Sequence, residues 1–254
     1  MVGQRITTIL AAIAFVATLG VNAAANILPI NGLNTGQVSE LFPSMFTPAG
    51  FTFSIWSAIY LLLLGFVILQ LYWVAQRAYL QRILPWFIAS CVLNASWIVA
   101  WHYLLPAVAW LLMLALLFSL IRIFQALNQH RQWTETWLEK VFVRLPFTIY
   151  LSWICVATIA NTASWLHFAT DWPLLQNEVA WTSAMMVVAS LLALYVTHRF
   201  QAPAFAAVVI WALFGIFARH QQHPLLSVVA VVLIVLLGSV YIYTSQKVLR
   251  EGLR

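Results

Sequence analysis

The sequence predicts an all-α integral membrane protein with about eight transmembrane helices, and three observations support this fold class. The chain of 254 residues is 64% hydrophobic and only 7% charged, with a mean hydropathy of +0.93. One water-soluble core cannot bury so many apolar side chains. The apolar residues form long runs without the alternating polarity of a transmembrane β-barrel. Finally, almost all Lys and Arg residues fall on one side of the membrane when the runs are threaded through it alternately.

The individual helices follow from the lengths of the apolar runs. A helix needs about 20 mostly apolar residues to cross a hydrocarbon core about 30 Å thick. Eight runs have this character, and none contains Asp or Glu. The seventh is the shortest, at about 17 residues, and barely spans the hydrocarbon. In chain order the predicted spans are residues 6–28, 50–75, 83–103, 105–126, 144–166, 179–198, 203–219 and 224–244.

The first run has a second interpretation. Arg5, the apolar stretch 6–20 and the small residues at 23–25 also resemble a cleaved signal peptide. We favour a retained helix, because the apolar run continues to Leu28 and is longer than a usual signal core. Cleavage would also leave the later helices without their first partner.

Positive charge marks the cytoplasmic side of a membrane protein. Threading the eight spans alternately places eleven of the 12 Lys and Arg residues on one side, with Arg219 on the other. Removing an internal span would exchange the sides of every later residue, so this bias supports the count of eight. We therefore expect both termini in the cytoplasm and the chain in a bacterial cytoplasmic membrane. Topology and contact with anionic membrane lipids explain the net charge of +6, so nucleic acid is not an expected partner.

The content of the spans argues against most catalytic sites and against ion-coupled transport. The spans hold no paired carboxylates, no Ser-His-Asp set and no pair of His residues at metal-ligand spacing. All six acidic residues fall in predicted loops or in the tail, whereas coupled transporters usually carry a titratable group within the membrane. Cys91 and Cys155 lie in spans as small apolar residues, so neither a disulfide nor a metal site is expected.

Tryptophan and amide side chains gather in the outer half of several spans. The chain has 13 Trp residues, more than a belt at the membrane interface requires. Two spans place such residues on one helical face. These are Asn94, Trp97 and Trp101 on the third span and Trp153, Ala157 and Asn161 on the fifth.

This pattern has two interpretations at the Asn residues. Each amide either bonds a neighbouring helix or contacts a ligand, and the pattern leaves both open. The loop 29–49 precedes the second span and carries Glu40 as its only charge. Outer-half Trp and Asn beneath a loop with a single charge suggest a pocket for a flat, largely apolar molecule.

Three blocks of the sequence resemble the tryptophan-rich sensory protein family, which includes the mitochondrial translocator protein, or peripheral benzodiazepine receptor. They are FTPAGFTFSIWSAIYLLL at 46–63, LNASWIVAW at 93–101 and LPFTIYLSWICVATIANTASW at 145–165, in the order of the family. The resemblance implies five helices around a pocket that the loop after the first helix closes. It also implies porphyrins and other tetrapyrroles, sterols and benzodiazepine-type drugs as ligands.

The motifs of that family can be carried over residue by residue. On this resemblance Pro48 and Gly50 form a structural motif that shapes the start of the second helix. Trp56 helps form the pocket. The ligand-binding residues that the resemblance implies are Phe53, Trp56, Tyr60, Asn94, Trp97, Trp101, Trp153, Ala157 and Asn161.

The resemblance covers about residues 1–166 and predicts a translocator-protein-like five-helix membrane domain there, with a three-helix membrane extension at 167–254. We expect a protein that binds a hydrophobic small molecule, a porphyrin or haem, as a sensor or in ligand handling, without a required cofactor. The alternative is a small-molecule transporter, which the eight-helix count favours and the lack of membrane carboxylates disfavours. The resemblance also suggests porphyrin photodegradation, for which the sequence offers no acid, base or metal site, and a homodimer.

Overall fold

The computed structural model shows an all-helical chain. It describes residues 2–28, 30–41, 44–73, 77–129, 136–169 and 177–252, and within these ranges the chain contains no β-strand. Seven helices in these ranges are long and apolar enough to cross a membrane, and the apolar helix Pro203–Arg219 is shorter. The predicted fold class is confirmed: the protein is an all-α, multi-pass membrane protein.

The chain divides into two compact units. Unit 1 comprises Met1–Leu41 and Ile55–Ile154, and unit 2 comprises Phe42–Ser54 and Cys155–Arg254. The fifth long helix, α7 (Leu145–Ala169), begins in unit 1 and continues into unit 2. The domain boundary expected from the sequence, after residue 166, stays a prediction.

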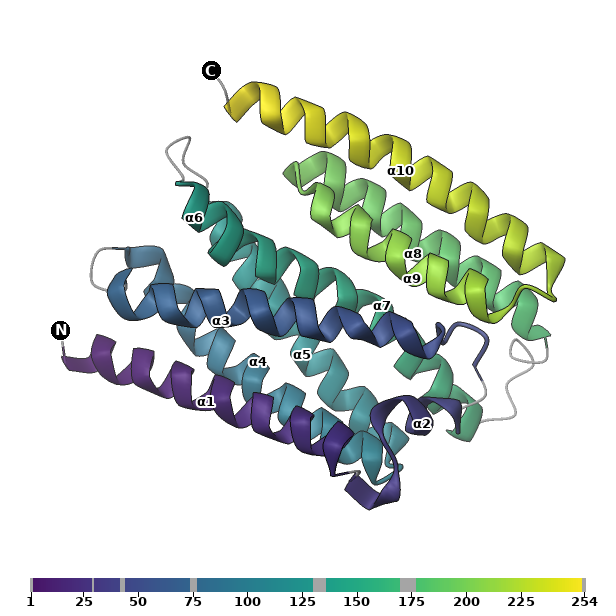
Figure 1. Cartoon of the computed structure of the whole chain (residues 1–254), viewed down its shortest axis with the longest axis horizontal. Coiled ribbons are helices and arrows are strands. Elements are labelled where there is room, and N and C mark those ends of the chain that lie inside the picture. Colours follow the sequence, from purple (N-terminus) through teal and green to yellow (C-terminus); the bar gives the residue numbers. More distant parts are fainter. Residues whose placement is uncertain are drawn as a thin grey trace. The chain divides into compact units, whose positions relative to one another are not determined.

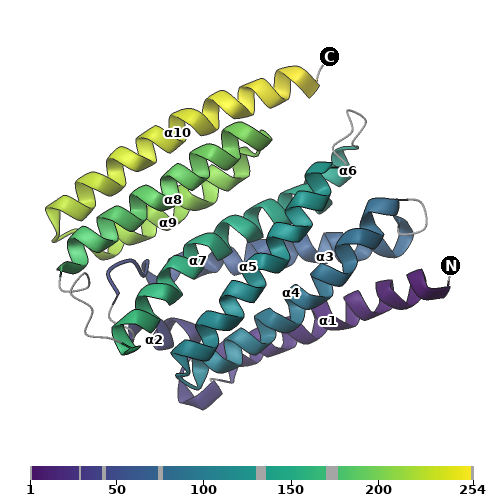
Figure 2. The ribbon, with the colours of Figure 1, turned by 180° about the vertical axis from the view of Figure 1, so that it is seen from behind.

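In unit 1, α4 lies between α1 and α5 (Figure 2). Helix α1 also contacts α3, and the short helix α2 contacts α4. The long helices are α1 (Val2–Ile27), α3 (Ile55–Trp73), α4 (Ala78–His102), α5 (Pro106–Gln129) and the start of α7. The short elements are η1 (Ile30–Gly32), α2 (Thr35–Glu40), α6 (Trp137–Glu139) and the π-helical turn η3 (Lys140–Arg144).

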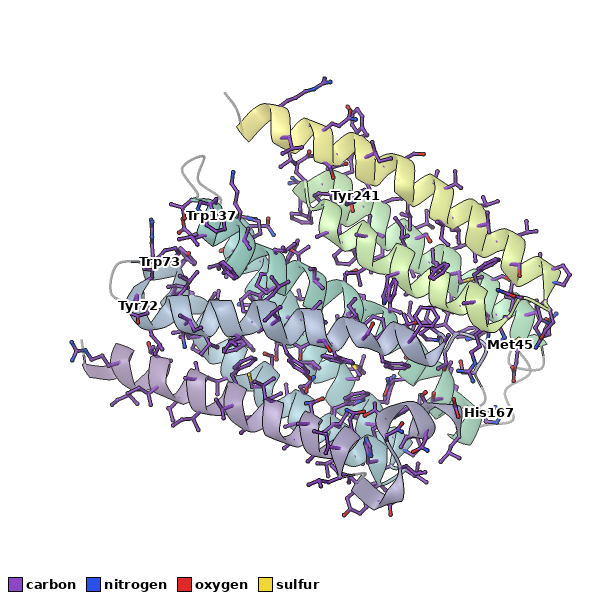
Figure 3. All side chains as sticks on the ribbon, viewed as in Figure 1. Met45, Tyr72, Trp73, Trp137, His167 and Tyr241 are labelled. Carbon is purple, nitrogen blue, oxygen red and sulfur yellow. The ribbon has the colours of Figure 1, made fainter. Side chains whose placement is uncertain are left out.

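Four phenylalanines from four different helices form the core of unit 1. The Phe66 ring lies edge-on to the rings of Phe87 and Phe147, with centroids 5.1 Å and 4.9 Å away. Phe15 reaches Phe87 at 6.3 Å. All four side chains are at most 1% exposed, so this cluster joins α1, α3, α4 and α7. At one end of unit 1, Tyr72, Trp73 and Trp137 lie near one another (Figure 3), as expected for residues at a membrane interface.

Unit 2 consists of three helices that pack pairwise, together with η2 (Gly50–Ser54) and the end of α7. The three are α8 (Glu178–Phe200), α9 (Pro203–Arg219) and α10 (Pro224–Gly252), which lie side by side in Figure 1. Helix α8 is followed by Gln201, whose φ of 50° is left-handed, and Pro203 starts α9 two residues later. All three helices carry buried alanines, including Ala193, Ala206 and Ala230. In lipid the hydrophobic effect does not drive helices together, and these small side chains allow the helices to pack closely instead.

The eight predicted spans coincide with eight helices, but their ends differ. The second span was expected at residues 50–75, whereas α3 comprises Ile55–Trp73 and the preceding residues Gly50–Ser54 form the separate turn η2. Helix α4 begins at Ala78 instead of residue 83, and α10 continues to Gly252 instead of ending near residue 244. The added turns carry residues such as Arg82 and Lys247, which favour a helix but not hydrocarbon. In α4 and α10, hydropathy therefore located the apolar part of the helix, while the backbone hydrogen bonds continue beyond it.

Candidate functional site

The side chain of Trp56 lies at the centre of an aromatic cluster in unit 1. Its ring stacks on Tyr60, one turn further along α3, with centroids 5.4 Å apart, and on Trp97 of α4 at 6.5 Å. It is edge-on to Tyr150 at 5.7 Å and to Trp153 at 6.4 Å, both on α7. Trp101 continues the series by stacking on Trp97 at 5.9 Å. We call these six residues the indole cluster.

Helical spacing produces this cluster. Trp56 and Tyr60 are separated by one turn, as are Trp97 and Trp101, so each pair projects from one face of its helix. Trp97, Trp101 and Trp153 are at most 6% exposed, whereas Trp56 is half-buried. Trp56 is thus the indole of the cluster with the most accessible ring.

The buried amide of Asn94 lies beside the cluster and joins three other helices to α4. Its Oδ1 accepts a hydrogen bond from Asn22 Nδ2 at 2.8 Å and one from the Tyr60 hydroxyl at 3.3 Å. Its Nδ2 donates to the Tyr150 hydroxyl at 3.1 Å. Asn94 is 0% exposed, and both lone pairs of its carbonyl oxygen are used. The amide therefore bonds α1, α3 and α7, which is the helix-joining alternative that the sequence had left open.

Two tyrosines connect this network to the indole cluster. Tyr60 stacks on Trp56 and donates to Asn94, while Tyr150 contacts Trp56 and accepts from Asn94. The sequence motifs did not single out Tyr150 or Asn22, although Asn22 was visible as an amide in the first span. No side chain in the cluster or the network is charged, so the region offers aromatic faces and neutral hydrogen-bonding groups.

Three of the predicted ligand-binding residues belong to unit 2. Phe53 lies in η2, and Ala157 and Asn161 lie one turn apart on α7. Asn161 is 5% exposed, and its Nδ2 donates to the Ala157 carbonyl at 2.9 Å. The contribution of these three residues to a ligand site stays a prediction.

The first part of the loop after α1 is held by His102 at the end of α4. The imidazole is 0% exposed, with Nδ1 at 3.1 Å from the Ile30 carbonyl oxygen and Nε2 at 3.1 Å from Thr35 Oγ1. The Asn31 amide donates back to the His102 carbonyl at 3.1 Å. His102 therefore fixes η1 and the start of α2 against α4.

The second part of that loop packs on α9 within unit 2. The Ala49 amide donates to the Gly215 carbonyl at 3.0 Å, and Trp211 Nε1 donates to the Thr52 carbonyl at 2.9 Å. The Phe51 ring contacts Trp211 at 5.5 Å. Pro48 and Gly50, the predicted structural motif, thus belong to a segment that one of the C-terminal helices holds in place.

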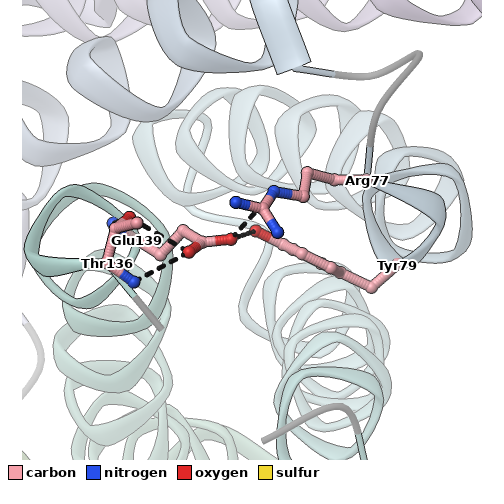
Figure 4. A network of polar contacts seen from close by, with 4 residues as sticks. All are labelled: Arg77, Tyr79, Thr136 and Glu139. Carbon is pink, nitrogen blue, oxygen red and sulfur yellow. Dashed lines mark hydrogen bonds and ion pairs between the residues drawn. The ribbon is translucent and has the colours of Figure 1, made fainter. Parts of the chain in front are cut away.

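A polar network at the start of α6 involves an acid that the sequence had assigned to a loop (Figure 4). Glu139 Oε1 accepts from the Tyr79 hydroxyl at 3.0 Å and lies 3.4 Å from Arg77 Nε. Glu139 Oε2 accepts from the Thr136 backbone amide and hydroxyl, each at 3.0 Å. Glu139 lies in α6 and is 5% exposed. The sequence placed it in the connection before the fifth span but did not indicate that its side chain is buried. Thr-x-x-Glu is a capping-box pattern and could have indicated a helix start here.

Comparison with known proteins adds one finding. A family model described as TSPO-like protein matches residues 8–243 of the chain. The match continues past residue 166 and includes α8, α9 and α10 up to residue 243. No curated protein and no solved structure matches the chain significantly.

Proposed function

The chain belongs to the TSPO-like protein family, and from this membership we propose that it binds a flat, hydrophobic, tetrapyrrole-like ligand beside Trp56, as a sensor or in ligand handling. The observation that carries the proposal is the contact of one half-buried indole with four other aromatic rings. Stacked and edge-on ring pairs contribute about 0.5–1.5 kcal/mol each beyond the area that they bury. A planar ligand can replace such contacts with equivalent ones of its own.

The neutral surroundings of the cluster support a largely apolar ligand. Hydrogen bonds join Asn94 to Tyr60 and Tyr150, which lowers the cost of keeping these polar groups in the membrane. Rotation of either hydroxyl would supply a hydrogen bond to a ring nitrogen or carbonyl of a ligand. The carboxylates of a porphyrin would have to remain at the water boundary, because the cluster contains no cation.

The test is a titration of the full-length protein in nanodiscs with protoporphyrin and, separately, haem. Binding is followed by quenching of tryptophan fluorescence and by the induced circular dichroism of the porphyrin band, which does not depend on the number of tryptophans. Trp56→Phe and Asn161→Ala are compared with Trp137→Phe, which replaces an indole that is 66% exposed.

Saturable binding that Trp56→Phe weakens and Trp137→Phe leaves unchanged is the expected result. A weaker complex with Asn161→Ala would add that residue to the site. Linear quenching, or identical curves for all proteins, would overturn the proposal. In that case accumulation of a tracer in proteoliposomes would test the transporter alternative.

A further inference from the structure

We propose that α4 and α5 carry a binding site for the phosphodiester of an anionic phospholipid, centred on Arg122 and Trp86. The Arg122 guanidinium carbon lies 5.5 Å from the centroid of the Trp86 ring. The same ring lies edge-on to Phe118, one turn from Arg122 on α5, at 5.6 Å. The guanidinium is therefore held against an aromatic face that leaves its edge free for a bidentate contact with phosphate.

The position of Arg122 within its helix favours an anionic partner. It lies seven residues before Gln129, the last residue of α5, which is about 10 Å along the helix axis. Its side chain is exposed, and its neighbour Phe118 is 54% exposed, so this face of α5 meets lipid. Neither α4 nor α5 contains Asp or Glu. A permanently charged side chain near the helix end extends toward the headgroups, and a lipid phosphate there would neutralise it.

Helix α4 supplies further groups beside Trp86. Arg82 is exposed one turn away from Trp86, toward the start of the helix. Pro85 lies within α4 and has no amide hydrogen, so the carbonyl of Gln81 loses its usual helical donor. Gln81 and Pro85 are both exposed. That carbonyl can accept from a hydroxyl of the headgroup, while the guanidinium binds the phosphate.

The surface next to these groups suits an acyl chain and not a free phosphate ion. From Phe118 the exposed face of α5 continues through Leu111, which is 59% exposed, and α4 exposes Val92 by 56%. These apolar side chains lie on the far side of Trp86 from Arg82 along the two helices. A phosphodiester with a glycerol headgroup and acyl chains, such as phosphatidylglycerol, matches both the cationic and the apolar parts.

The test is native mass spectrometry of the delipidated full-length protein with phosphatidylglycerol, phosphatidylethanolamine and phosphatidylcholine of identical acyl chains. We expect one phosphatidylglycerol to bind more tightly than the other two lipids. Arg122→Gln should weaken that binding about fivefold, the contribution of one cation near an anionic lipid. Arg199→Gln is the matched control, because Arg199 also lies over an aromatic ring, Phe200 at 5.6 Å, but at the end of its helix.

Arg122→Lys keeps the charge and removes the planar fork, so its affinity for phosphatidylglycerol should lie between those of the wild type and Arg122→Gln. Melting in phosphatidylcholine shows whether each variant is folded. Unchanged lipid affinity in Arg122→Gln would overturn the proposal, as would wild-type protein that binds phosphatidylglycerol no better than phosphatidylethanolamine or phosphatidylcholine. Equal weakening by Arg199→Gln would show general charge attraction instead of a site.

Discussion

At the scale of single residues, two buried polar side chains of unit 1 form hydrogen bonds to other segments. Asn94 joins α1, α3 and α7 to α4, and His102 joins the loop after α1 to the end of α4. In a membrane a polar group without a partner is costly, so each of these residues selects one arrangement of its neighbours. The aromatic rings beside them are positioned by the same contacts.

Replacing Asn94 by Ala should destabilise the protein by about 2 kcal/mol, because it removes three hydrogen bonds and leaves buried partners unsatisfied. The measurement is the melting temperature of the purified protein in detergent. Asn26→Ala is the matched control: Asn26 is exposed and donates only to the Asn22 carbonyl on its own helix. An Asn94→Ala protein that melts with the wild type would contradict the role of this network.

His220, in the connection between α9 and α10, should make stability depend on pH. Burial, Arg219 and His223 lower the pKa of His220 from its ordinary value of 6.5, and a hydrogen bond to the Met45 carbonyl partly opposes them. The folded chain therefore binds this proton less readily than the unfolded chain does. Stability from this group is complete above pH 6.5 and is lost as the pH falls toward the lowered pKa.

His220→Gln keeps a donor for the Met45 carbonyl and removes the titration. We expect the melting temperature of this variant to fall less than that of the wild type when the pH is lowered from about 7.5 to about 5. His198→Gln, at an exposed position on α8, is the control and should keep the wild-type slope. Identical slopes for His220→Gln and the wild type would show that other groups cause the pH dependence.

At the scale of secondary-structure elements, α9 acts as a platform for the segment that contains Pro48 and Gly50. The contact is close because Gly215 has no side chain: a Cβ there would overlap Thr52 Oγ1 and lie 2.8 Å from Pro48 Cβ. Two hydrogen bonds and the Phe51 ring complete the interface. The shortest of the apolar helices thus has a defined packing role within unit 2.

Gly215→Ala should lower stability by about 1–2 kcal/mol, because overpacking against Thr52 and Pro48 outweighs the better helix propensity of Ala. Gly238→Ala on α10 is the matched control, since nothing lies within 4 Å of a Cβ at that position. The control should be neutral or stabilised. Adding Thr52→Ala to Gly215→Ala should restore part of the lost melting temperature. A Gly215→Ala protein that is as stable as the wild type, or more stable, would exclude a tight contact at Gly215.

At the scale of the whole molecule, the distribution of positive charge predicts how the protein is oriented in the membrane. The connection after α9 is predicted to face outward and the end of α10 inward, since Arg219 is alone on its side. Gln222 and Lys247 are exposed and represent the two sides.

With Cys91 and Cys155 replaced, Gln222→Cys should react with a membrane-impermeant maleimide on intact cells. Lys247→Cys should react only after the membrane is permeabilised. Labelling of both positions in intact cells, or the reverse pattern, would contradict the predicted topology.

The sequence by itself determined the fold class, the eight helices and the membership of Trp56, Asn94 and Trp97 in recognisable motifs. These properties depend on local quantities: the length of an apolar run, the helical period and residue types at fixed spacing. The motifs did not show that Tyr150 and Asn22 complete the network around Asn94. They also did not show that Glu139 is buried against Tyr79 or that the Pro48 segment packs on α9. These contacts join residues between 56 and 166 positions apart or rest on one missing Cβ, so only the tertiary structure decided them.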